Sequence, residues 1–153
     1  MIGVKKQGPV TGFIAVVVLL SAIMAGYGES PKGRFVGDAA KVVGTWTGES
    51  ICVNKEKFPA CNDERVVYRL AQSASAADVV TITMDKIVDG KAEMMAELDF
   101  KYDAEKGTLV NEFTRNTVRG VWAFTVKGNS MEGTLTVLPD KTLVRRIKLK
   151  KGA

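Results

Sequence analysis

The chain has 153 residues, of which 22 are Lys or Arg, 17 are Asp or Glu, two are Cys and none is His. This length suits one domain with a substantial core. A composition of 46% apolar and 25% charged residues is ordinary for a folded protein. The absence of His excludes Ser-His-Asp triads, Cys-His pairs and most zinc sites. Composition therefore restricts the chemistry of the protein without identifying the molecule on which it acts.

Residues 1–26 differ from the rest of the chain. Lys5 and Lys6 are the only charged residues before Glu29, and the stretch from Gly12 to Gly26 is almost entirely apolar and ends in small residues. This order is typical of a secretory signal peptide. The alternative is a retained N-terminal membrane anchor, but the strongly apolar part has about 15 residues and a spanning helix needs about 20. We therefore expect a signal peptide over residues 1–26 and a periplasmic or secreted protein.

Cys52 and Cys61 are the only cysteines. In an exported protein two cysteines at this spacing usually pair, so we expect a structural disulfide. The alternatives are a redox pair, which would favour C-x-x-C spacing, and a metal site, which needs more ligands than two Cys without His. The sequence thus predicts a disulfide and no metal site.

Residues 27–42 are polar and contain Gly and Pro, which predicts a linker with a short helical turn near Asp38–Val42. Beyond it, alternation of apolar and polar residues predicts eight strands, at 43–52, 64–72, 78–88, 91–103, 107–115, 118–127, 130–139 and 141–150. Without helices to make parallel crossovers, neighbouring strands should pair antiparallel. Closure into a barrel buries one face and removes both edges, whereas a two-sheet sandwich usually needs longer connections. We predict an all-β domain, an eight-stranded antiparallel up-and-down barrel, over residues 43–153.

The alternation also predicts which side chains point into the barrel. Gly48, Gly120 and Gly133 lie on the inward rows, where they either leave room for a ligand or mark strand bends. Arg145 falls on the inward row of the last strand, so it needs an aromatic face, a carboxylate or backbone carbonyls as partners. The larger inward residues form either plain core or the lining of a ligand site, and they are Tyr68, Ile82, Met84, Met94, Leu98, Phe100, Asn111, Phe113, Trp122, Phe124 and Leu135.

Gly44-Thr45-Trp46 opens the first predicted strand, and with the inward Arg145 of the last strand it resembles the lipocalins and the wider calycin superfamily. The resemblance covers residues 43–150 as architecture and these residues as motif. It implies that Trp46 closes one end of the barrel with Arg145 stacked over its indole. It also implies that the first loop lies over the open mouth, where Phe58 is either a lid or a side chain packed on the rim.

These features predict an exported lipocalin-like protein that holds a small apolar or amphipathic ligand. The alternative is a filled barrel that inhibits or docks on an envelope protein through the Cys52–Cys61 loop or residues 27–42. We expect no enzyme activity and no cofactor, because the inward rows carry no pair of nucleophile and base. Nucleic acid is not an expected partner, because no basic face interleaved with aromatic residues is present.

Overall fold

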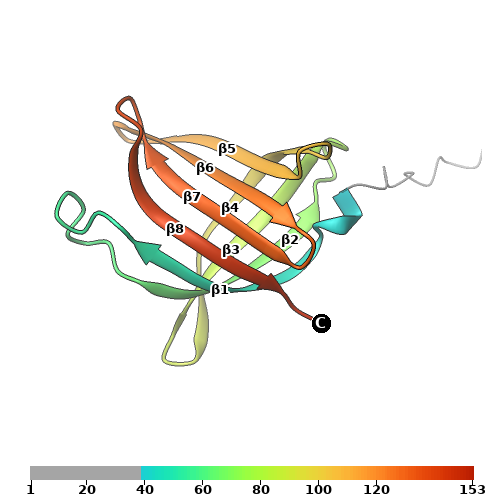
Figure 1. Ribbon diagram of the computed structural model, residues 1–153, viewed down its shortest axis with the longest axis horizontal. Coiled ribbons are helices and arrows are strands. Elements are labelled where there is room, and N and C mark those ends of the chain that lie inside the picture. Colours follow the sequence, from blue (N-terminus) through green and yellow to red (C-terminus); the bar gives the residue numbers. More distant parts are fainter. Residues whose placement is uncertain (1–38) are drawn as a thin grey trace, which may run out of the picture. The chain divides into compact units, whose positions relative to one another are not determined.

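A computed structural model describes residues 39–153, so the predicted signal peptide, most of the linker and Asp38 lie outside the described residues. Figure 1 shows a barrel in which each strand pairs antiparallel with the next and the last strand pairs with the first. The predicted eight-stranded barrel is therefore confirmed. Its elements are the 3-10 helix η1 (Ala39–Lys41) and strands β1 (Gly44–Cys52), β2 (Glu64–Gln72), β3 (Val79–Val88), β4 (Lys91–Asp103), β5 (Thr108–Arg115), β6 (Val118–Lys127), β7 (Ser130–Val137) and β8 (Thr142–Lys151).

The predicted strands agree with the observed ones to within a few residues, because turn chemistry marks most of the boundaries. Asp89 and Gly90 both have positive φ, as the two-residue turn between β3 and β4 requires. Within residues 39–153, no helix has the length and apolar character needed to cross a bilayer.

Closure of the barrel depends on a close approach between β1 and β8. Their register runs from Trp46 opposite Lys151 to Cys52 opposite Arg145. At Gly48 the strands lie so close that a Cβ atom would be 2.0 Å from the carbonyl oxygen of Lys148. Glycine at this position therefore lets the two strands approach, rather than leaving room for a ligand.

The other two inward glycines are covered by aromatic rings from neighbouring strands. A Cβ at Gly120 would be 2.5 Å from the Phe113 ring, and one at Gly133 would be 2.2 Å from the Phe124 ring. Both pairs are direct cross-strand neighbours, Phe113 with Gly120 and Phe124 with Gly133. The space that these glycines leave is thus filled by side chains of the barrel itself.

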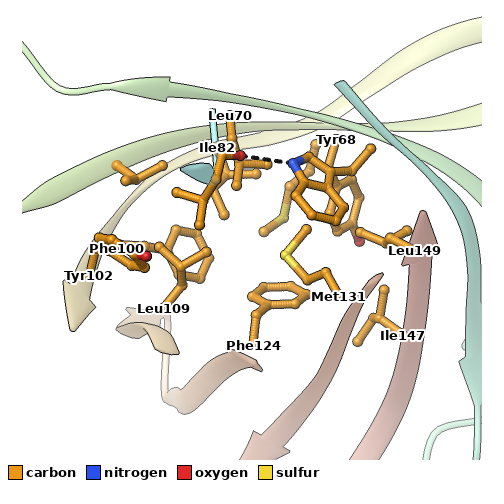
Figure 2. Close-up of a cluster of buried hydrophobic side chains, with 14 of the residues drawn as sticks. Tyr68, Leu70, Ile82, Phe100, Tyr102, Leu109, Phe124, Met131, Ile147 and Leu149 are labelled. Atoms are coloured by element: carbon orange, nitrogen blue, oxygen red, sulfur yellow. Dashed lines mark hydrogen bonds between the residues drawn. The ribbon is translucent and has the colours of Figure 1, made fainter. Parts of the chain in front are cut away.

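The end of the barrel near η1 is a solid hydrophobic core. Trp46 is fully buried, and its Nε1 donates a 2.9 Å hydrogen bond to the carbonyl oxygen of Val42. Figure 2 shows this bond as a dashed line, with the ring of Phe124 and the side chain of Met131 packed in the same cluster. The Phe124 ring meets the Tyr68 ring edge-on, with centroids 6.1 Å apart. Trp46 is therefore part of a densely packed region of the barrel.

The Cys52–Cys61 disulfide is present as predicted. The loop that it ties is held a second time by Asp63, whose carboxylate accepts hydrogen bonds from the Cys52 backbone N–H (2.9 Å) and the Lys55 ammonium (3.0 Å). These two donors hold the pKa of Asp63 below its ordinary value. The connection from β1 to β2 is therefore constrained where it leaves the barrel.

The close approach at Gly48 generates a stability prediction. We expect Gly48→Ala to lower the free energy of unfolding by about 3 kcal/mol, because the obstructing Lys148 oxygen belongs to the backbone and cannot rotate away. Gly152→Ala is the matched control, since a Cβ there makes only an ordinary 3.4 Å contact with the Thr45 oxygen. Urea unfolding measures both variants, and equal midpoints would contradict the proposed role of Gly48 in closure.

Candidate functional site

An open cavity of about 440 Å³ lies inside the barrel. Its walls come from β1 to β6 and from β8, so it is a feature of the whole barrel and not of one hairpin. Most of its lining is apolar, and the polar groups gather mainly on β1, β2 and β8. The lining residues are Ser50, Glu64, Tyr68, Met84, Met95, Ala96, Leu98, Phe113, Thr114, Arg115, Trp122 and Arg145.

In one wall of the cavity, the backbone hydrogen bonds between β4 and β5 stop before the strands end. β4 and β5 pair only from Lys101 opposite Val110 to Asp103 opposite Thr108, although β4 stays paired with β3 as far as Lys91. Just past this ladder, the Asn111 side chain donates a 2.8 Å hydrogen bond to the Asp99 carbonyl oxygen. Farther along, both strands line the cavity, β4 with Met95, Ala96 and Leu98 and β5 with Phe113, Thr114 and Arg115.

The polar side of the cavity is built around Arg145. Its Nη1 donates to Ser50 Oγ at 2.7 Å and lies 3.0 Å from the Glu64 carboxylate, and its Nη2 donates to the Asn62 carbonyl oxygen at 2.9 Å. The Arg145 and Glu64 side chains are only 12% and 22% exposed. Arg145 thus has the carboxylate and backbone carbonyls that an inward guanidinium needs.

Tyr68 brings an unpaired hydroxyl to the same region. The residue is fully buried and lines the cavity, and among the described residues no group completes a hydrogen bond with its hydroxyl oxygen. Burial raises the pKa of Tyr68, and the negative charge of Glu64 adds to this rise. The positive charge of Arg145 and the interaction with the Ser50 hydroxyl oppose it. The phenol therefore stays protonated at neutral pH and can donate to a bound molecule.

The expected stacking of Arg145 on Trp46 is wrong. The β1–β8 register puts Arg145 opposite Cys52, whereas Trp46 lies opposite Lys151, about 20 Å farther along the strand. Lys151 Nζ lies 5.6 Å from the centre of a Trp46 ring and donates to the Lys41 carbonyl oxygen at 2.7 Å. Alternation correctly puts Arg145 inside the barrel, but only the register decides at which end it lies. Gly44, with a φ of 130°, packs against this same lysine, since a Cβ there would be 3.1 Å from Lys151 Cε.

Apart from Met94, the predicted ligand-lining residues divide into three groups. Tyr68, Met84, Leu98, Phe113 and Trp122 do line the cavity. The second group consists of buried core residues outside the cavity, namely Ile82, Phe100 and Phe124, and the third of Asn111 and Leu135, which are partly buried and do not line it.

Met94 is the clear error in that set, because its side chain is on the outside of the barrel and is 70% exposed. The register of β3 and β4 shifts after Met84, where Ala96 is its partner, so that Asp85 pairs with Met94. Met95 is the extra residue of this β-bulge, and the bulge reverses the alternation beyond it. The cavity is lined by Met95 instead.

The sequence held signals for several residues that were missed. Ser50 and Ala96 lie on the inward rows, and Glu64 has the same parity as Tyr68 on β2, so alternation alone would have placed it inside. Phe58 is half-buried in the first loop and is not among the residues that line the cavity. Its role as a lid stays a prediction.

No family model matches the sequence, and no curated protein matches it significantly. Solved structures match the fold. Fatty-acid-binding protein 1 of Echinococcus granulosus is 15% identical, with a TM-score of 0.51 over 74% of this chain and 99% of that chain. A variant of the fluorescent protein UnaG is 14% identical, with a TM-score of 0.51 over 74% of this chain and 98% of that chain. The chain therefore shares a barrel fold with these proteins, as the resemblance implied.

The Arg145–Glu64 pair generates a second prediction. We expect Arg145→Met to lower the free energy of unfolding by about 2–3 kcal/mol, because the mostly buried Glu64 carboxylate loses its counter-charge. Combining it with Glu64→Gln should recover most of that loss. Arg119→Met is the control, because it breaks an exposed ion pair with Glu112 and should cost at most about 1 kcal/mol. Additive losses in the double variant would show that the two charges do not depend on each other.

Proposed function

We propose that this protein is a binding module that holds a small apolar or amphipathic molecule inside its barrel. The observation that carries the proposal is the open interior cavity of about 440 Å³, which lies within the range of about 300–1,000 Å³ common for ligand sites. Apolar side chains with a few converging polar groups are the usual lining of such sites. Met84, Met95, Phe113 and Trp122 supply large and adaptable apolar surfaces.

The fold supports the same proposal. One solved structure with this barrel is a fatty-acid-binding protein by its name, and a barrel of about eight strands is wide enough to hold one small ligand. The sequence alternative, a filled barrel that acts on an envelope protein through its loops, requires an interior without such a cavity. Binding is also favoured over catalysis, because the polar cluster of the cavity contains a guanidinium paired with a carboxylate and no activated nucleophile.

We further propose that the chain is exported to the periplasm or secreted. A basic and then apolar segment at residues 1–26 and a disulfide between Cys52 and Cys61 both support export. Expression of the full chain with mass spectrometry of the mature protein tests this. We expect to find the protein outside the cytoplasm, as a chain shortened by about 26 residues at its N-terminus. A full-length chain in the cytoplasm would contradict export.

Filling the cavity tests the binding proposal. We expect Ala96→Phe to weaken binding of the neutral apolar dye Nile red at least tenfold, because Ala96 lines the cavity and its replacement occupies the space. Ala92→Phe is the matched control, since Ala92 lies on the same strand but is exposed, and it should leave the affinity unchanged. Circular dichroism verifies that both variants are folded. No dye binding by the unchanged protein, or equal binding by Ala96→Phe, would overturn the proposal.

A further inference from the structure

Within the proposed ligand-binding function, we infer that the cavity selects molecules with an uncharged hydrogen-bonding head, such as an alcohol, over free carboxylic acids. This inference rests on the proposed function and adds the chemical class of the ligand. It follows from the charge balance and the hydrogen-bonding state of Arg145, Glu64, Ser50 and Tyr68 at the polar side of the cavity.

The charges inside the cavity already cancel. Arg145 and Glu64 are within 3.0 Å of each other, and both are mostly buried. A carboxylate that approached Arg145 would meet Glu64 next to it, so that two negative charges would share one guanidinium in a site with little water. Such an uncompensated buried charge is unfavourable. An uncharged head enters without this cost.

The guanidinium is also engaged by neutral groups. Ser50 Oγ and the Asn62 carbonyl oxygen accept from its two terminal nitrogens, in addition to the Glu64 contact. A ligand carboxylate that bound across Nη1 and Nη2 would have to displace one of these partners. Arg145 is therefore placed to organise the site rather than to receive an anion.

The Tyr68 hydroxyl is the group in the site that still needs a partner. It is buried and has no completed hydrogen bond among the described residues, and a buried hydroxyl without a partner is unfavourable. A phenol both donates and accepts, which suits an alcohol, a carbonyl or an amide on a ligand. Tyr68 lines the cavity with its hydroxyl covered, so a neutral head would displace the side chains over this hydroxyl to bond with it, while the chain of the ligand lies against Met84, Leu98 and Trp122.

Arg115 offers a competing arrangement. It is an exposed cation that lines the cavity from the end of β5, so an acid could bind with its carboxylate at the mouth and its chain inside. Exposed charge pairs contribute little because water screens them, whereas the interior costs of an anion are larger. We therefore favour the neutral head, and the experiment below includes a variant of Arg115.

Displacement of Nile red by decanol and by decanoate tests the inference, because the two compounds share a chain and differ in the head. At pH 7 we expect decanol to bind at least tenfold more tightly. Decanoate should gain affinity as the pH falls through about 5, where the carboxylic acid becomes neutral. Equal or tighter binding of decanoate at pH 7 would overturn the inference while leaving the proposed binding function intact, and absence of Nile red binding would overturn both.

Variants separate head recognition from simple hydrophobicity. Glu64→Gln should raise decanoate affinity about tenfold with little change for decanol, whereas the surface control Glu112→Gln, which removes the same charge from an exposed ion pair, should change neither. Tyr68→Phe should weaken decanol about fivefold to tenfold without lowering the melting temperature, because the lost hydroxyl has no partner in the free protein. Unchanged decanol affinity in Tyr68→Phe would contradict the inference. Loss of decanoate binding in Arg115→Gln, with tight decanoate binding in the unchanged protein, would assign the acid to the mouth instead.

Discussion

The pairing of β1 with β8 determines where the inward cations of β8 lie relative to Trp46 and the cavity. These strands come from opposite ends of the described domain, and their register sets Lys151 beside Trp46 and Arg145 beside Cys52. The approach is close enough that only glycine fits at position 48. If the register shifted by two residues, the same side chains would still point inward, but the cations would meet different partners. The register of β1 with β8 thus places a cation both beside Trp46 and at the polar side of the cavity.

The fold could be predicted from the sequence because its main signals are local. Alternation in β3, β6 and β7 and turn residues such as Asp89-Gly90 define strands and their connections without reference to distant residues. The site could be predicted only in part, because it depends on long-range pairing. Alternation shows that Arg145 points inward, yet its distance from Trp46 depends on the register between strands about a hundred residues apart in sequence. The bulge at Met95 likewise has no strong local signal, and it reverses the side on which Met94 lies.

Side chains fill one half of the barrel interior, and the other half contains the cavity. In the filled half, an aromatic ring packs over a glycine of the neighbouring strand. Phe124 lies over Gly133 and contacts Tyr68 and Phe100, so the half of the barrel near Trp46 is filled. At the other end β4 and β5 separate beyond the pair of Lys101 and Val110, and side chains from these two strands do not close the interior. A barrel whose core is complete at one end can keep a cavity at the other, because hydrophobic burial around Trp46 supports the fold without contributions from the cavity walls.

The unpaired Tyr68 hydroxyl lies between the filled half of the barrel and the cavity, and it affects both stability and binding. A phenylalanine at this position would bury the same ring beside Phe124 and would avoid an unsatisfied oxygen, so the hydroxyl makes the free protein less stable than its packing allows. A molecule that supplies the missing partner binds the folded chain and not the unfolded one, and it therefore stabilises the fold in proportion to its affinity and concentration. An anion cannot supply that partner without also approaching Glu64. The same carboxylate that lets Arg145 remain inside the barrel thereby restricts which head group can complete the site.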